Sequence, residues 1–201
     1  VNNQIGMTFA AGLRAILRQD PDVVMIGEIR DPETAEIAVQ ASLTGHLVLS
    51  TVHTNSAVAA IARLRDMGVE SFLLSSTITA LVAQRLVRRL CEKCKCTYEP
   101  SLNEKEELGI SKLKKAFYKA KGCSHCNNTG YVGRIGIYEI VTLDENLRSL
   151  IHDGASELEI SNYAFKNRQS LLGSGAERVL SGETSAQEVL RVCKSNIADE
   201  I

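Results

Sequence analysis

Four of the six cysteines in this 201-residue sequence form two C-x-x-C pairs, a pattern typical of metal ligation. Cys91 and Cys94 lie in "CEKC", and Cys123 and Cys126 lie further along in "CSHC". Two such knuckles predict a closed tetrahedral site that holds structural Zn²⁺ through four thiolates. Redox-active or unliganded thiols are the alternatives. The two other cysteines lie outside the pairs and should be dispensable for the metal: Cys96 and Cys193.

A second candidate for chemistry is Glu28, in the stretch "VVMIGEIRD". The apolar run Val23 to Ile26 is typical of a strand, and ligands of doubly wound sheets bind beyond the carboxyl ends of such strands. A carboxylate there can accept a hydrogen bond from a Mg²⁺-bound or attacking water and orient it. The alternative is a strand that simply becomes polar where it meets solvent. Gly27 also stands where a typical Walker B motif has aspartate.

Two histidines lie at opposite ends of the next apolar run, "HLVLSTVH". At ~3.3 Å per strand residue, His46 and His53 are roughly 23 Å apart, so they cannot share one metal ion. His53 falls at the carboxyl end, beside Glu28 if the two strands are neighbours, where an imidazole can hydrogen-bond a terminal phosphate. His46, at the other end, is more typical of a structural histidine.

Arg14 and Arg18 are four residues apart on one predicted helix, so they lie on the same face. Paired guanidinium groups, with Arg30 in the "GEIRD" turn, suit the clamping of a phosphate or a carboxylate. Solvated surface arginines are the equal alternative.

The elements that must position these residues alternate between helix and strand up to residue 90, which predicts an α/β fold with a parallel sheet. The expected elements are a helix from Thr8 to Arg18, a fully buried strand at Val23–Ile26, a helix after the N-cap Asp31 that ends before Gly45, a second buried strand in "HLVLST", a helix capped by Asn55 or Ser56 that ends at Gly68, and helical segments from Phe72 to Leu90.

From Cys91 onward the composition changes. The Lys/Glu-rich segment between the cysteine pairs should form one or two short helices, and "GRIGIYEIV" a short strand. The remainder should be helical: Glu145–His152, Glu157–Asn167, Leu171–Leu180 and Ala186–Val192, the last with a capping box of Ser185 and Glu188. The expected domains are 1–90, 91–133 and 134–201.

The composition, 44% hydrophobic and 23% charged, is that of an ordinary soluble globular protein. A formal net charge of −1, with four phenylalanines, five tyrosines and no tryptophan, argues against a general nucleic-acid binder. No apolar run approaches the ~18 residues of a membrane helix, and we expect no signal peptide. Because the sequence lacks an initiator Met and enters a predicted helix almost at once, we expect a fragment of a longer protein.

Two long segments resemble a known family. The segment "LRQDPDVVMIGEIRDPETAEIAVQASLTGHLVLSTVHTNSA" resembles the Walker B and His-box region of the type II/IV secretion ATPases. The segments "VAQRLVRRLCEKC" and "GCSHCNNTGYVGRIGIYEI" resemble its tetracysteine branch, which includes the general secretion ATPases (GspE or PulE) and the pilus-extension ATPases (PilB). The resemblance implies the C-terminal half of a RecA-like P-loop ATPase core, followed by a tetracysteine zinc-binding module and an all-helical C-terminal domain.

The resemblance also implies cofactors and residue roles, namely ATP and Mg²⁺ at the core and Zn²⁺ at the cysteines. Glu28 is implied as the Walker B acid that acts on Mg²⁺ and the attacking water, and His53 as the His-box residue nearer the γ-phosphate. Gly27 is normal for the family. The residues implied at the nucleotide or the subunit boundary are Arg14, Arg18, Arg30, His46 and Arg134.

The family's G-x-x-x-x-G-K-[ST] loop is expected upstream of this sequence, so the 201 residues alone should bind nucleotide weakly and hydrolyse none. The resemblance further implies a cytoplasmic homo-hexamer at the inner membrane that contacts secretion platform proteins and drives pseudopilus assembly and protein export. From the balanced charge and the few aromatic residues, we expect no nucleic-acid partner. The alternatives are a pilus-extension ATPase, a non-catalytic zinc interaction module or truncated relic and, more weakly, a zinc-ribbon nucleic-acid binder.

Overall fold

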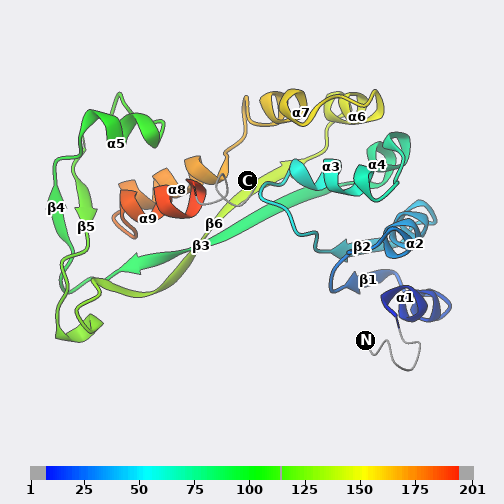
Figure 1. Cartoon of the computed structure of the whole chain (residues 1–201), viewed down its shortest axis with the longest axis horizontal. Coiled ribbons are helices and arrows are strands. Elements are labelled where there is room, and N and C mark those ends of the chain that lie inside the picture. Colours follow the sequence, from blue (N-terminus) through cyan, green and yellow to red (C-terminus); the bar gives the residue numbers. More distant parts are fainter. Residues whose placement is uncertain (1–7, 114, 195–201) are drawn as a thin grey trace. The chain divides into compact units, whose positions relative to one another are not determined.

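The computed structural model describes residues 8–113 and 115–194, whose helices and strands are labelled in Figure 1. The chain divides into two compact units, Val1–Leu81 with Val141–Lys166 (unit 1) and Val82–Ile140 with Asn167–Ile201 (unit 2). Among the helices of the described residues, none has the length and apolar character that crossing a bilayer requires. The three-part division expected from the sequence, with boundaries after residues 90 and 133, stays a prediction.

Unit 1 begins with two helix–strand pairs that confirm the predicted alternation. Helix α1 (Phe9–Leu17) begins where the Thr8 side chain accepts a hydrogen bond from the backbone of Ala11, and α2 (Pro32–Leu43) begins where Asp31 caps Thr34 in the same way. Helix α2 ends before Gly45, whose φ of 101° glycine adopts at little cost. Strands β1 (Val23–Ile26) and β2 (Leu47–Ser50) follow these two helices.

Strands β1 and β2 pair in parallel, from Val23 opposite Leu47 to Ile26 opposite Ser50. Val24 and Ile26 are buried. Other apolar side chains of the two strands are exposed, by the following fractions of their surface: Val23 (55%), Met25 (77%), Leu47 (51%) and Leu49 (48%). The expectation that both strands are fully buried is therefore wrong. An apolar run shows that a strand can be buried on both faces, but burial needs a second layer, and none of the described residues covers these side chains.

Four further helices complete unit 1: α3 (Ala59–Asp66), α4 (Ser71–Thr77), α6 (Glu145–His152) and α7 (Glu157–Ala164). Helix α4 packs on α6, where the Arg148 guanidinium donates a hydrogen bond to the carbonyl oxygen of Ser75. Arg65 on α3 donates to the carbonyl oxygens of Ile151 and Ala155, each at 2.8 Å. These arginines attach residues 141–166 to the first part of the chain.

The predicted helical stretch from Phe72 to Leu90 is wrong beyond Thr77, because β3 (Ala80–Leu90) is a strand. Its buried positions, Ala83, Val87 and Leu90, are spaced four and three residues apart, which also suits a helix. The deciding factor is a partner strand, β6 (Tyr131–Thr142), which lies on the far side of the cysteine-rich segment in sequence. The arrows of β3 and β6 run in opposite directions in Figure 1.

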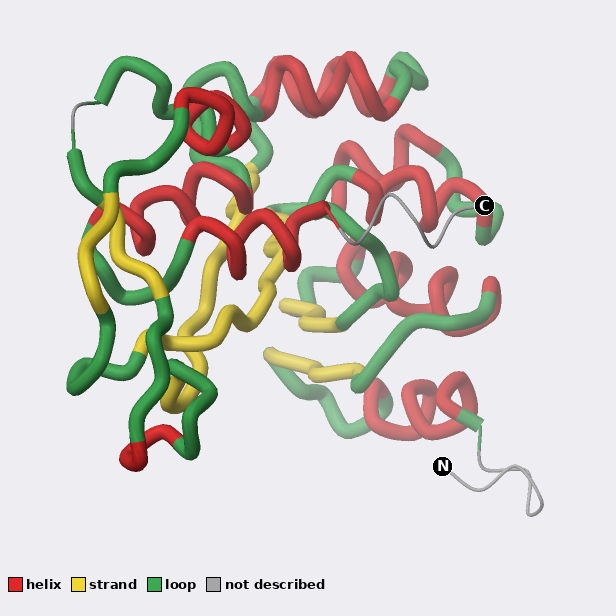
Figure 2. Tube along the Cα trace, turned by 60° about the vertical axis from the view of Figure 1, so that its left-hand side comes forward, coloured by secondary structure: helices red, strands yellow, loops and turns green. Residues whose placement is uncertain are grey.

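Unit 2 contains most of the β3–β6 ribbon, the cysteine-rich segment and two C-terminal helices. Between the cysteine pairs lie β4 (Cys96–Tyr98), α5 (Leu102–Glu107) and β5 (Phe117–Lys119), and β4 and β5 pair antiparallel, side by side in Figure 2. The single helix α5 agrees with the expectation for this segment, whereas β4 and β5 are too short for a sequence pattern to show. The unit ends with α8 (Leu171–Leu180) and α9 (Ala186–Lys194), which pack on each other.

A buried carboxylate joins α9 to β3. The fully buried side chain of Glu188 accepts hydrogen bonds from the backbone and the guanidinium of Arg88, at 3.1 and 2.8 Å, and from Arg191 at 2.7 Å. Burial acts to raise the pKa of Glu188, but the two arginines outweigh it and lower that pKa to about 2. Ser185 accepts the Glu188 N–H, as predicted for the cap, whereas the carboxylate is used for the arginines.

Candidate functional site

Glu28 and His53 meet at the carboxyl ends of β1 and β2. The last residues of these strands, Ile26 and Ser50, are register partners, so the segments that follow them leave the sheet at the same edge. His53 Nε2 lies 3.1 Å from Oε2 of Glu28. The expected proximity of His53 and Glu28 is therefore confirmed, and it depends on the parallel pairing that the sequence predicted.

Arg30 donates a hydrogen bond from Nε to the same Glu28 oxygen. Partial burial acts to raise the pKa of Glu28, but the hydrogen bonds with Arg30 and His53 and the positive charge of the Arg30 guanidinium outweigh it and hold that pKa below its ordinary value. The Glu28 side chain is 20% exposed, whereas those of Arg30 and His53 are 67% and 78% exposed. Glu28 is therefore an ionised hydrogen-bond acceptor that solvent reaches at the carboxyl ends of β1 and β2.

The Glu28 turn is also held by Thr51, a residue that no motif of the sequence marks as functional. Thr51 Oγ1 donates to the carbonyl oxygen of Gly27 at 2.7 Å, and the N–H of Ile29 donates to the Thr51 carbonyl at 2.9 Å. The sequence points to Thr51 only through its position, because it is the first residue after β2 and therefore lies next to the turn that follows β1.

The structure places Arg14, Arg18 and His46 outside the Glu28 cluster. Arg14 pairs with Glu33 at 2.8 Å, which joins α1 to α2, while Arg18 is exposed at the end of α1. His46 Nδ1 lies 3.0 Å from the carbonyl oxygen of Ala41, at the end of α2. Arg14 and His46 also line one hollow of about 530 Å³. The nucleotide roles that the resemblance implies for these three residues stay predictions.

Arg134 lies in unit 2, on the exposed side of β6. Together with Arg88, Thr129, Tyr131 and Gly133 it lines a hollow of about 550 Å³. The Arg88 guanidinium lies over the Tyr131 ring, 4.1 Å from its centre, and is held there by Glu188. The implied role of Arg134 at a nucleotide or subunit boundary stays a prediction.

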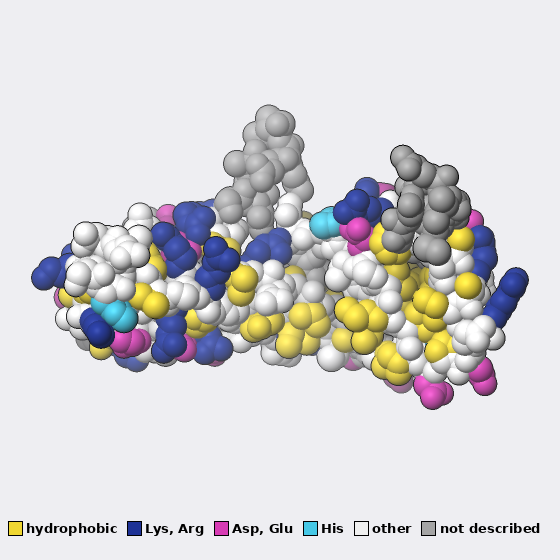
Figure 3. Space-filling view, turned by 90° about the horizontal axis from the view of Figure 1, so that it is seen from below, with side chains coloured by type: hydrophobic (Ala, Val, Ile, Leu, Met, Phe, Trp, Pro, Cys, Tyr) yellow, Lys and Arg dark blue, Asp and Glu magenta, His cyan; other side chains and the backbone are white. Residues whose placement is uncertain are grey.

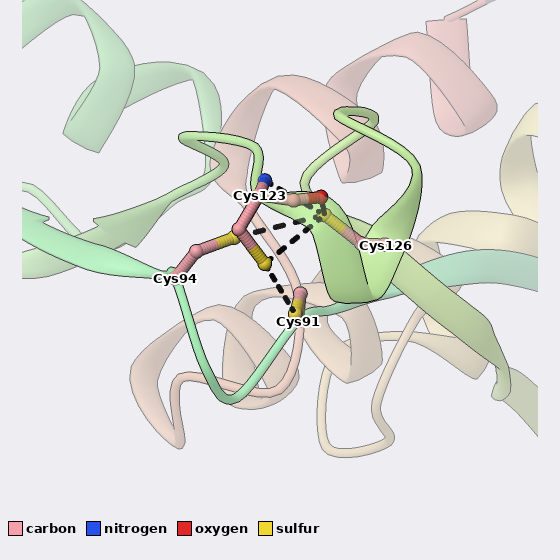
Figure 4. Close-up of side chains that lie close together, drawn as sticks. All are labelled: Cys91, Cys94, Cys123 and Cys126. Atoms are coloured by element: carbon pink, nitrogen blue, oxygen red, sulfur yellow. Dashed lines mark hydrogen bonds between the residues drawn. The ribbon is translucent and has the colours of Figure 1, made fainter.

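The four paired cysteines converge, as Figure 4 shows, with two from each knuckle. All four Sγ atoms lie within 4.8 Å of one another. The closest pairs are Cys91–Cys123 at 3.9 Å, Cys94–Cys126 at 3.8 Å and Cys123–Cys126 at 3.7 Å. Four sulfurs at the Zn–S distance of ~2.3 Å stand about 3.8 Å apart at the corners of a tetrahedron. The cluster is thus compatible with zinc in both donor type and spacing.

The backbone around the cluster is arranged to receive negative sulfur. The N–H groups of Cys123 and Gly130 each point at Cys126 Sγ from 3.2 Å. Burial acts to raise the pKa of Cys126, but these two hydrogen bonds outweigh it and lower that pKa to about 6. Burial raises the pKa of Cys94 to about 11, and hydrogen bonds with the neighbouring cysteine side chains act in the same direction.

The second knuckle depends on a glycine. Gly130 has a φ of 76°, and a Cβ there would lie 2.5 Å from the Cβ of Ala120. Its carbonyl oxygen also accepts the N–H of Cys91 at 2.9 Å, which ties the two knuckles together. The expectation that a helix precedes each cysteine pair is wrong, because strands β3 and β5 precede them. Cys96 and Cys193 are free thiols outside the four-sulfur group.

The fold is shared with the solved structures of a pilus retraction motor and of an ATPase. The pilus retraction motor PilT, solved with bound ADP, superposes with a TM-score of 0.64 and 25% identity over 92% of this chain and 43% of that one. The Legionella pneumophila ATPase DotB superposes with a TM-score of 0.62 over 96% of this chain and 42% of that one, and at 23% identity it supports the fold alone. The chain therefore has a RecA-like α/β fold, accompanied by a tetracysteine cluster and C-terminal helices.

Residues 1–191 match the family described as "Type II/IV secretion system protein", and the chain belongs to this family. "Type II secretion system protein E" of Pseudomonas aeruginosa is 56% identical over 195 residues, and "Type II secretion system ATPase E" of Vibrio cholerae is 54% identical over 198 residues. These matches cover 96% and 98% of the chain but 39% of each relative. The chain thus spans about two fifths of the length of these relatives.

Proposed function

We propose that the chain is the part of a type II secretion ATPase that orients the attacking water and carries the structural metal site. In the whole protein, this part couples ATP hydrolysis to pseudopilus assembly and protein export. The names of the relatives support the type II branch over the pilus-extension alternative. The observation that carries the proposal is the contact of Glu28 with His53 at the carboxyl ends of two parallel strands.

The chemistry follows from the charge of Glu28. Because its pKa is held low, Glu28 is an anion at neutral pH, and an anion accepts hydrogen bonds from water but repels phosphate. Its task is therefore to hold and polarise the attacking water. His53, on the exposed side of the same carboxylate, is placed to donate to a phosphate oxygen. A bound Mg²⁺ would neutralise charge on the phosphates during transfer.

The sequence contains no G-x-x-x-x-G-K-[ST] motif, so the cradle for the β- and γ-phosphates must come from another segment of the whole protein. We expect the 201-residue chain alone to hydrolyse ATP no faster than background. The contribution of Glu28 is therefore best measured in a chimera, in which this chain replaces the matching 198 residues of the Vibrio cholerae ATPase E.

In this chimera, Glu28→Gln should lower kcat for ATP at least a hundredfold, because the amide cannot accept a proton or polarise water as an anion does. The apparent affinity for ATP should stay within about twofold, since the carboxylate does not hold the phosphates. Glu106→Gln is the matched control, because Glu106 is an exposed acid on α5, in the other compact unit. Full activity of the Glu28→Gln chimera would remove the proposal.

The cofactors, partners and location extend the proposal to the whole protein. We propose one Zn²⁺ at Cys91, Cys94, Cys123 and Cys126, supported by the spacing of their sulfurs. We further propose a homo-hexamer that lies in the cytoplasm and is peripheral to the inner membrane, where it contacts secretion platform proteins. Arg14, Arg18, Arg30 and Arg134 are proposed to serve the nucleotide or the boundary between subunits, whereas the contacts of His46 with Ala41 and Thr44 favour the structural role for that residue.

A further inference from the structure

Thr51 contacts the turn that carries Glu28 on both sides of the acid. Its hydroxyl donates to the carbonyl oxygen of Gly27 at 2.7 Å, and its carbonyl oxygen accepts the N–H of Ile29 at 2.9 Å. The residue between these two hydrogen bonds is Glu28. A single residue of one strand end therefore fixes the peptide groups before and after the acid on the neighbouring strand end.

The two hydrogen bonds of Thr51 differ in kind. The bond from Ile29 uses the Thr51 backbone, which any residue provides, and Ile29 itself is anchored in the core at 7% exposure. The bond to Gly27 needs a hydroxyl, and alanine or valine would leave it unmade. Among the described residues, a Cβ added at Gly27 would meet one atom within 4 Å, a ring carbon of Phe9 at 3.8 Å, so packing is sparse on that side of Gly27.

Thr51 also lies two residues before His53, on the segment that brings the imidazole to Glu28. The Thr51 hydroxyl thus joins the segment after β2, which carries His53, to the segment after β1, which carries Glu28. We propose that Thr51 is a positioning residue, which holds the Gly27–Ile29 turn so that the carboxylate of Glu28 faces His53 and the attacking water. This inference rests on the function proposed above.

The hydrogen bond from Thr51 is exposed to solvent, so its loss should affect geometry more than stability. In the chimera, Thr51→Val keeps the shape of the side chain and removes the hydroxyl. We expect kcat to fall about tenfold or more, with KM for ATP within about twofold, because small displacements of a water-orienting group act on the transition state. Thr51→Ser restores the hydroxyl and should recover most of kcat.

Thr77→Val is the matched control, because the Thr77 hydroxyl also donates to a backbone carbonyl, that of Leu73, at 2.7 Å but within helix α4. A second readout uses the 201-residue chain itself. Side-chain carboxyl NMR of Glu28 should show its pKa rising towards the ordinary value in Thr51→Val, since the contacts with His53 and Arg30 that hold it low are loosened. Thr51→Ser and Thr77→Val should leave it in place.

Wild-type kcat and an unchanged Glu28 pKa in Thr51→Val would overturn the inference. The inference would also be overturned if kcat fell equally in Thr51→Val, Thr51→Ser and Thr77→Val, in step with their melting temperatures. Thr51 would then have a purely structural role. Failure of the proposed function gives a different pattern, in which the Glu28→Gln chimera stays active. The Glu28 titration then still shows whether Thr51 positions the acid.

Discussion

Glu28 and His53 stand 25 positions apart in sequence, yet His53 Nε2 lies 3.1 Å from the Glu28 carboxylate. The contact exists because β1 and β2 are neighbours, run in parallel and end at the same level. It places an anionic acceptor and an exposed imidazole at one sheet edge, where doubly wound folds bind their ligands.

Figure 3 shows one face of the molecule, on which groups of apolar side chains lie exposed among charged ones.

His53→Ala in the chimera should lower kcat for ATP by about ten- to a hundredfold, because it removes a donor from the Glu28 edge. The His53 side chain is 78% exposed, so the melting temperature should change little. Steady-state kinetics and thermal unfolding measure the two effects, with the exposed His152→Ala as control. A large drop in melting temperature with unchanged kcat would assign His53 a structural role.

His46→Ala should behave in the opposite way. Its ring contacts the Ala41 carbonyl and the Thr44 hydroxyl, at 3.0 and 3.1 Å, at the C-terminal end of α2. Loss of these contacts should cost about 1 kcal/mol of the free energy of unfolding, measured by urea titration of the 201-residue chain. Chimera turnover below the unfolding range should change less than twofold. Lost turnover at unchanged stability would instead support the nucleotide role that the resemblance implies.

Protein purified without chelator should contain one Zn²⁺ per chain by metal analysis. Cys123→Ser should lose it, whereas Cys96→Ser should keep it, because Cys96 lies outside the four-sulfur group. Zn²⁺ binding in small zinc peptides contributes a free energy on the order of 10–16 kcal/mol, part of which stabilises the folded state, and removing the metal removes this contribution. Hydrogen exchange should therefore rise in residues 91–133 and stay low in α2. Equal metal loss from both variants, or a disulfide between the knuckles, would contradict the zinc assignment.

The buried Glu188 should make stability depend on pH in the acid range. Its pKa is about 2 in the folded chain against 4.5 as the ordinary value, so the unfolded chain binds the proton more readily. The stabilisation is fully present above pH 4.5 and is lost as the pH falls towards 2, a difference on the order of 3 kcal/mol.

Glu188→Gln should remove this difference, so that the stability gap between variant and wild type is constant above pH 4.5 and closes as the pH approaches 2. Glu106→Gln, an exposed acid of the same unit, is the control and should follow the wild type. Urea unfolding between pH 2 and 7 measures the effect. A gap between Glu188→Gln and wild type that does not depend on pH would show that packing, not charge, holds Glu188.

The sequence by itself determined the features that are local in the chain. Asp31 and Gly45 mark the ends of α2 because N-cap and C-terminal glycine chemistry acts within a few residues. The C-x-x-C spacing that predicted metal ligation is likewise local to each cysteine pair. The apolar runs gave β1 and β2, and their parallel pairing placed His53 beside Glu28.

Only the tertiary structure decided the features that depend on a distant partner. Ala83, Val87 and Leu90 suit either a helix or a strand, and pairing of β3 with β6 selects the strand. The burial of Glu188 depends on Arg88, which is 100 positions away, and no local pattern shows that contact. Thr51 is an ordinary threonine in sequence, and it becomes a clamp on the Glu28 turn because two strands end side by side. Which remote segments form hydrogen bonds or bury each other depends on the surfaces that meet in the folded chain. The hydrophobic periodicity of one segment does not show which partner that segment will pack against.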